Sequence, residues 1–148
     1  MISGMNDSPG RLVLVADDSP IVAEALRELV EEAGAQVLGP AADGTEALRL
    51  FLDAAPDVAL LDVQMPGMTG IEVTRAIRAA PGGERCLVIV VTSSREPEVR
   101  RHALAAGADH FLLKGELHRV VDLLSARNAG DAPPGAAPDG APAPPVGK

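Results

Sequence analysis

The feature that most limits the fold of this chain is a regular alternation between short apolar runs and longer segments with helical spacing. Five runs are rich in Val, Leu, Ile or Ala, and they are Leu12–Ala16, Gln36–Leu38, Val58–Leu61, Leu87–Val91 and Phe111–Leu113. Most of these runs are continuously apolar, which is typical of parallel strands that are covered on both faces. The pattern predicts five strands, each followed by a helix.

The segments between the runs carry apolar residues at helical intervals. The stripe predicted for the first helix comprises Ile21, Val22, Ala25, Leu26, Leu29 and Val30. A second, shorter helix is predicted from Ala47, Leu48, Phe51 and Leu52, and the last from Leu117, Val120, Val121 and Leu124. The fold class is therefore α/β, a (βα)5 doubly wound arrangement in which right-handed crossovers place helices on both faces of an open parallel sheet.

Residues with known preferences for helix ends agree with this division. Ser19–Pro20 offers an N-cap followed by proline at the first helical position. Thr69 and Glu72 have the spacing of a capping box, in which each side chain accepts a hydrogen bond from the other residue's backbone. Gly34 and Gly107 each stand where a helix is expected to end.

The length of 148 residues suits one domain. Residues 1–10 are expected to form a flexible lead and residues 11–128 the folded domain. Residues 129–148 are dominated by Ala, Pro and Gly, so this tail has little to bury and is expected to be disordered.

Charge and hydropathy exclude several classes of protein. The net charge is −8 and no run of Lys or Arg is present, which argues against direct nucleic-acid binding by this chain. No apolar run is long enough to cross a bilayer, and the N-terminus lacks the features of a signal peptide. We therefore expect a cytoplasmic protein that does not associate with membranes.

Polar residues stand at the ends of four of the five predicted strands. Asp17 and Asp18 follow the first strand, Asp62 follows the third, Thr92 the fourth and Lys114 the fifth. Ligands of open parallel sheets bind beyond the carboxyl ends of the strands. These carboxylates, the hydroxyl and the ammonium group are therefore expected to line one edge of the sheet.

With these strand-end residues and the segments around them, the chain resembles the receiver domains of two-component response regulators, including chemotaxis receivers. The resemblance covers about residues 11–126 and is carried by Leu14–Ser19, Ala42–Leu48, Pro56–Asp62, Met65–Gly70 and Gly107–Asp109. It implies a flavodoxin-like fold with a five-stranded sheet in the order 2-1-3-4-5. It also implies a phosphoprotein that takes part in a phosphorelay and binds Mg²⁺ as its cofactor.

The resemblance implies a magnesium site made of hard oxygen ligands. Asp18 and Asp62 would bind Mg²⁺ directly, and Asp17 would bind it through water. The backbone carbonyl of Gln64 would complete the protein's share of the metal-binding ligands.

In the same family a phosphoryl group is accepted by the residue that matches Asp62, since a carboxylate can attack phosphorus to give an acyl phosphate. Lys114 would supply fixed positive charge, and Thr92 would bond a phosphoryl oxygen. Gln64 and Ser94 would flank the path of a hydrolytic water and tune the lifetime of the phosphate.

Receivers transmit their state through a switch, and the resemblance places it here in Thr92 and Phe111. It would bias two packings of the face formed by the fourth helix, the fifth strand and the fifth helix.

The chain departs from the pattern of the family at Gly115, because most receivers have a cis proline after the lysine. A non-proline cis bond costs roughly 3 kcal/mol, so we expect a trans bond and an altered turn.

We therefore expect a phosphoacceptor regulator that a sensor histidine kinase or phosphotransfer protein phosphorylates and that an unidentified output protein reads. A phosphorylation-dependent dimer would be compatible with this. The regulator would be free-standing, because no output domain follows, and would not be an enzyme with an external substrate.

Three alternatives stay open. The chain could be the receiver half of a DNA-binding transcriptional regulator, with the tail as the start of a linker. It could be a pseudo-receiver that serves only as a binding module, although the intact polar set argues against this. An aspartyl-phosphate hydrolase would need a second acid two residues after the nucleophile, where Gln64 stands.

Overall fold

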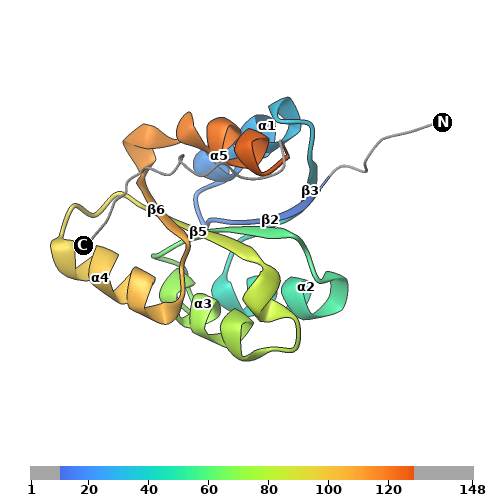
Figure 1. The fold of residues 1–148 in the computed structure, drawn as a ribbon. Coiled ribbons are helices and arrows are strands. Elements are labelled where there is room, and N and C mark those ends of the chain that lie inside the picture. Colours follow the sequence, from blue (N-terminus) through green and yellow to red (C-terminus); the bar gives the residue numbers. More distant parts are fainter. Residues whose placement is uncertain (1–10, 129–148) are drawn as a thin grey trace, which may run out of the picture.

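A computed structural model of the chain describes residues 11–128. The expected lead over residues 1–10 and the expected tail over residues 129–148 lie outside the described residues. Within the described part, strands and helices alternate as predicted (Figure 1). The strands are β2 (Leu12–Ala16), β3 (Gln36–Ala41), β4 (Val58–Asp62), β5 (Leu87–Thr92) and β6 (His110–Leu113). The helices are α1 (Pro20–Glu32), α2 (Gly44–Ala54), α3 (Gly70–Ala79), α4 (Pro97–Ala106) and α5 (Arg119–Asn128), with short 3₁₀ turns η1 (Gly83–Arg85) and η2 (Lys114–Glu116).

The five described strands form one parallel sheet in the order β3-β2-β4-β5-β6. In chain order this is 2-1-3-4-5, so the predicted topology is confirmed. The register aligns the carboxyl ends of neighbouring strands, because Ala16 pairs with Leu61 and Thr92 pairs with Leu113. Residues that end different strands are thereby brought to the same edge of the sheet.

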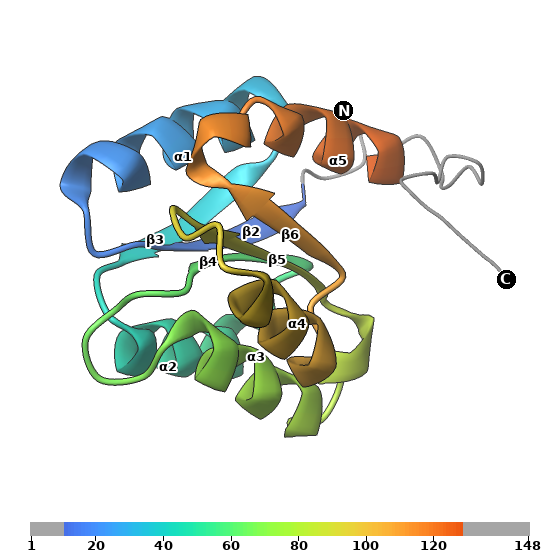
Figure 2. The ribbon, with the colours of Figure 1, turned by 90° about the vertical axis from the view of Figure 1, so that its left-hand side faces the viewer.

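Two layers of helices cover the sheet. Helices α1 and α5 lie on one face, and α2, α3 and α4 lie on the other (Figures 1 and 2). Successive side chains of a strand point to opposite faces, so Val13 and Val15 of β2 pack in the α1/α5 layer while Leu14 packs in the other. The inner strands β4 and β5 are buried along their whole length, as expected for a sheet covered on both faces.

The predicted helix boundaries are confirmed. The Ser19 hydroxyl accepts a hydrogen bond from the backbone N–H of Val22 at the start of α1. Thr69 and Glu72 form the reciprocal capping box of α3, at 3.1 Å and 3.0 Å. Gly107 ends α4 with a φ of 114°, a left-handed conformation that favours glycine.

Several strand boundaries differ from the prediction. Strands β4 and β5 each continue one residue further, so that they end in Asp62 and Thr92, and β6 begins one residue earlier. Strand β3 reaches Ala41 although its apolar run is broken by Gly39–Pro40. A proline is tolerated there because β3 is an edge strand, where a missing backbone N–H need not interrupt a ladder.

Two residues of the predicted apolar stripes are wrong as core residues. Ile21 is 83% exposed and Leu52 is 58% exposed. In α1 the buried line is Ala23, Leu26 and Val30, and Ile21 lies about 200° around the helix from Ala23 at 100° per residue. Proximity in sequence to other apolar residues therefore did not place these two side chains on the buried face.

Over residues 11–128, no helix is both long enough and apolar enough to span a membrane.

Candidate functional site

Four neighbouring strands deliver the polar residues singled out in the sequence to one edge of the sheet. Asp17 and Asp18 directly follow β2, and Asp62 is the last residue of β4. Thr92 is the last residue of β5, and Lys114 directly follows β6. Because these strands are adjacent and in register, the predicted convergence is present in the structure.

The three aspartates form a compact cluster. One carboxylate oxygen from each of Asp17, Asp18 and Asp62 lies within 4.8 Å of the other two. Asp17 and Asp62 are each only 2% exposed, whereas Asp18 is exposed. Like charges at such distances repel, and burial of two of them removes the water that would screen the repulsion.

Lys114 provides the one ammonium group that pairs with this cluster among the described residues. Its Nζ lies 3.3 Å from Asp17 Oδ2 and 3.5 Å from Asp62 Oδ1. One positive charge thus faces three carboxylates. With all groups ionised, the cluster keeps an excess of negative charge that a cation would offset.

Asp17 shows where such a cation would fit. Its Oδ1 accepts a hydrogen bond of 2.8 Å from the backbone N–H of Ser19. Its Oδ2 is buried and accepts no hydrogen bond from the described residues. Lys114 Nζ is close enough to this oxygen for an ion pair but lacks the direction of a hydrogen bond. A buried, unbonded carboxylate oxygen beside two further carboxylates suits a hard divalent cation such as Mg²⁺.

The cluster is open to solvent on one side. Asp17 and Asp18 line a pocket of about 310 Å³ together with Pro20 and Pro40. The exposed Asp18 lies in this pocket, so a small ion or a donor group has a route to the carboxylates.

The pKa of Asp62 is raised from its ordinary value of 3.8 to about 6. Burial is the main cause, because it penalises the charged carboxylate, and the negative charge of Asp17 adds to the effect. The Lys114 ammonium and the backbone N–H of Gln64 act in the opposite direction, and Asp18 raises the pKa further. Asp62 is therefore still largely ionised at pH 7, but it is more basic than an ordinary aspartate.

Thr92 is fully buried at the end of β5, one residue past the partner of Asp62 in the sheet register. Its Oγ1 accepts a hydrogen bond of 3.1 Å from the backbone N–H of Ser94. The Ser94 hydroxyl in turn accepts one of 3.2 Å from the backbone N–H of Glu96. A hydroxyl that is occupied as an acceptor can still donate its hydrogen, so Thr92 retains a donor for a ligand.

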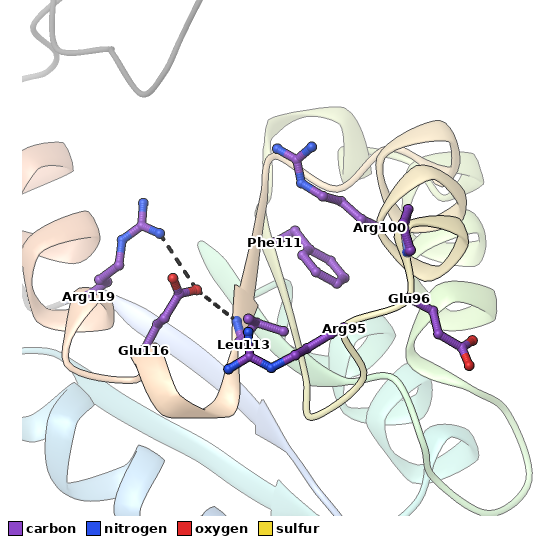
Figure 3. Close-up of a pocket in the computed structure, with 8 residues that line it drawn as sticks. Arg95, Glu96, Arg100, Phe111, Leu113, Glu116 and Arg119 are labelled. Carbon is purple, nitrogen blue, oxygen red and sulfur yellow. Dashed lines mark hydrogen bonds and ion pairs between the residues drawn. The ribbon is translucent and has the colours of Figure 1, made fainter.

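Phe111 lies on the side of the sheet edge that faces α4 and α5. It is half-buried and lines a pocket of about 460 Å³, with Arg95 and Arg100 from the α4 side and Arg119 from α5 (Figure 3). This pocket is separate from the carboxylates. Arg95 and Arg100 form no ion pair with any residue in the described range 11–128.

The turn after β6 differs from a lysine–proline turn in the manner expected. Within residues 11–128 the only cis peptide bond is Gly39–Pro40, so the bond between Lys114 and Gly115 is trans. Lys114 nevertheless reaches Asp17 and Asp62. The altered turn has not displaced the ammonium group from the cluster.

Glu116 is a residue of this turn that the sequence reasoning missed. Its Oε1 accepts a hydrogen bond of 3.0 Å from the backbone N–H of Leu113. The sequence carried a signal for this contact, because a glutamate three residues after the end of a strand has the spacing of half a capping box.

Gln64 was named from the sequence, and the structure places its side chain in an exposed position. The role of its backbone carbonyl as a metal ligand remains a prediction.

Comparison with known proteins points to one family. The family model described as the response regulator receiver domain matches residues 13–124. A protein-glutamate methylesterase/protein-glutamine glutaminase of Caulobacter vibrioides is 36% identical over an alignment 146 residues long, which covers 90% of this chain and 42% of that protein. The chemotaxis protein CheY of Thermotoga maritima is 30% identical over 78% of this chain and 96% of its own.

A solved structure agrees with these relatives. The signal receiver domain of the response regulator NarL from Mycobacterium tuberculosis superposes with a TM-score of 0.71 at 36% identity, covering 81% of this chain and all of that one. The chain spans less than half the length of the methylesterase relative. The likeness therefore concerns the described domain and not the remainder of that longer protein.

The raised pKa of Asp62 predicts a pH-dependent cost to stability. Between pH 3.8 and about 6 the folded protein holds the Asp62 proton more tightly than the unfolded chain does, so stability from this group is lost as the pH rises to about 6. In a buffer with chelator, Asp62→Asn should raise the free energy of unfolding at pH 7 by about 2 kcal/mol. The difference from the wild type should shrink toward pH 4.

Urea unfolding at pH 4, 5, 6 and 7 measures this difference. Asp53→Asn on the exposed surface of α2 is the matched control and should change little at any of these pH values. An effect of Asp62→Asn that is equal at pH 4 and pH 7 would contradict the assignment.

Proposed function

This chain belongs to the family of response regulator receiver domains, which act in two-component signalling, and we propose that it accepts a phosphoryl group on Asp62 in the presence of Mg²⁺. The observation that carries the proposal is the cluster of Asp17, Asp18 and Asp62 with Lys114 at the carboxyl edge of the sheet. A metal ion and a phosphoryl group both require such fixed charges at close range.

In the proposed reaction a carboxylate oxygen of Asp62 attacks the phosphorus of the donor. A P–O bond forms to Asp62 while the bond between phosphorus and the donor's leaving group breaks, and the product is an acyl phosphate. The raised pKa of Asp62 makes this oxygen more basic than that of an ordinary aspartate, and the group is still ionised at pH 7. Lys114 holds positive charge beside the phosphoryl oxygens, and the Thr92 hydroxyl donates to one of them.

Asp18 and Asp62 are proposed to hold Mg²⁺ directly, with Asp17 acting through water and the Gln64 carbonyl as a further ligand. The unbonded Oδ2 of Asp17 supports a cation at this place. When bound, Mg²⁺ would offset negative charge on the phosphoryl oxygens. Gln64 and Ser94 are proposed to adjust the lifetime of the phosphate through the access of water.

The phosphoryl donor is proposed to be a sensor histidine kinase or a phosphotransfer protein. The signal would leave through the face formed by α4, β6 and α5, where Phe111 lines the pocket (Figure 3). The Thr92 hydroxyl would move toward the phosphoryl group and Phe111 would turn inward behind it, which shifts the population between two packings. An output protein or a second copy of the chain would read this face, and no external substrate would be turned over.

Phosphorylation is tested by intact-mass measurement after incubation with a small acyl-phosphate donor and Mg²⁺. The wild type should gain the mass of one phosphoryl group, and Asp62→Ala should gain none, because the attacking oxygen is absent. Asp53→Ala serves as the control and should be modified like the wild type. No adduct on the wild type, either from the small donor or from candidate kinases, would favour a pseudo-receiver that serves only as a binding module.

Metal binding is tested by thermal unfolding with Mg²⁺ and with chelator. A ligand present at ten times its Kd stabilises the folded state by about 1.4 kcal/mol, so the melting temperature should rise measurably with Mg²⁺. Asp18→Asn should remove this rise, since an exposed ligand is lost without disturbing the core. Asp53→Asn should keep it. A rise that survives in Asp18→Asn would show that Mg²⁺ binds elsewhere.

The switch is tested by the NMR signals of the phenylalanine rings, since Phe51 and Phe111 are the chain's only two. Phosphorylation should shift the ring signals of Phe111 and leave those of Phe51, a buried residue of α2, nearly unchanged. Thr92→Ala should reduce the shift of Phe111 without preventing phosphorylation. An unmoved Phe111 signal in the fully phosphorylated protein would remove Phe111 from the switch.

A further inference from the structure

The turn that carries Lys114 presents a problem of positioning. Lys114 is the first residue beyond β6, and its ammonium group lies 3.3 Å and 3.5 Å from two carboxylates, of which Asp17 follows β2 and Asp62 ends β4. The next residue is Gly115, in the exposed part of η2. Glycine adds backbone freedom at the point where the direction of the chain decides where Lys114 reaches.

No steric requirement explains glycine at position 115. A Cβ built there would meet no atom within 4 Å, and the residue does not have the left-handed backbone that favours glycine. Gly115 therefore does not stiffen the turn, and another interaction must fix the path of the chain after β6.

Glu116 provides that interaction. Its Oε1 accepts the hydrogen bond from the backbone N–H of Leu113, so that the side chain folds back across Lys114 and Gly115 to the last residue of the strand (Figure 3). Leu113 is itself fixed by its pairing with Thr92 in β5. The carboxylate of Glu116 thus closes a ring that includes the backbone of Lys114 and Gly115, and Leu113 anchors that ring to the sheet.

We propose that Glu116 is a positioning residue, which holds the turn so that Lys114 stays directed at Asp62. The inference rests on the proposed phosphorylation of Asp62 and extends it to a residue that, within the described range, forms no hydrogen bond or ion pair with the three aspartates. In this chain the hydrogen bond from Leu113 to Glu116 constrains the turn after Lys114, where the glycine cannot.

The hydrogen bond carries this role, and the ion pair of Glu116 with Arg119 does not. The ion pair spans 3.8 Å between side chains that are 40% and 42% exposed, and exposed pairs of this kind contribute little. The bond to Leu113 is shorter and ties the side chain to the backbone. Glutamine offers the same acceptor oxygen without the charge, so Glu116→Gln separates the two interactions.

The first measurement is the rate of phosphorylation by a small acyl-phosphate donor, followed by intact mass. Glu116→Ala should slow the reaction about tenfold at saturating Mg²⁺, because the lysine is no longer directed at Asp62. Glu116→Gln should retain a rate within about twofold of the wild type. Glu84→Ala, an exposed glutamate of η1, is the matched control and should react at the wild-type rate.

The same substitution made on a Lys114→Ala background shows whether Glu116 acts through the lysine. Glu116→Ala should then cause no further loss of rate, since residues that act as a unit are not additive. A further tenfold loss on that background would overturn the proposal, because it would mean that Glu116 acts independently of Lys114.

A second measurement does not depend on phosphorylation. Lys114 and Lys148 are the only lysines of the chain, so labelling lysine with ¹³C and ¹⁵N gives two side-chain signals, and Lys114→Ala assigns them. Glu116→Ala should shift the Lys114 side-chain signal and leave that of Lys148 in place, whereas Glu116→Gln should leave both in place. The amide of Leu113 should exchange faster with solvent in Glu116→Ala alone.

These outcomes separate the two proposals. If the wild type is not phosphorylated but the Lys114 signal moves in Glu116→Ala, the phosphoacceptor proposal fails and the positioning of Lys114 stands. If the wild type is phosphorylated and Glu116→Ala reacts at the same rate with an unchanged Lys114 signal, the positioning role is excluded.

Discussion

Three carboxylates lie close together at one end of a buried sheet and repel one another, and the charge balance of the whole site depends on how this repulsion is offset. Burial and mutual charge act together on Asp62, whose pKa rises to about 6, and one ammonium group from Lys114 offsets only part of the cost. A fold optimised for stability alone would not place these groups together. Their presence indicates a site that needs further positive charge, which the divalent cation of the proposed function would supply.

The parallel sheet makes this concentration of charge possible. Strands that run in the same direction end at the same edge, so the polar residues that end or follow four of the five described strands are brought to one cluster. Strands β2, β4, β5 and β6 are neighbours in the sheet. The two helical layers cover the apolar faces and leave that edge accessible, and the pocket at Asp17 and Asp18 opens there. The parallel order of the strands therefore explains both the concentration of charged side chains and their access to solvent.

Local hydrogen bonds to the backbone fix the orientation of individual polar side chains. The backbone N–H of Ser19 engages one oxygen of Asp17 and leaves the other unbonded. The backbone N–H of Ser94 engages the Thr92 hydroxyl as an acceptor and leaves its hydrogen to donate. Glu116 holds the turn of Lys114 by the same kind of contact. In each case a hydrogen bond from a backbone N–H two or three residues away in the chain fixes a polar side chain at or beside the carboxylate cluster.

The sequence by itself determined the strand–helix alternation, the helix caps and the set of residues at the strand ends, because these depend on periodicity and on local backbone chemistry. It also allowed the sheet order to be expected from family resemblance. It could not determine that Ile21 faces solvent or that β3 continues through Gly39–Pro40, since burial and strand pairing depend on neighbours distant in the chain. Only the tertiary structure decided the distances from Lys114 to Asp17 and Asp62 and the raised pKa of Asp62, because these quantities depend on where separate strands meet in space.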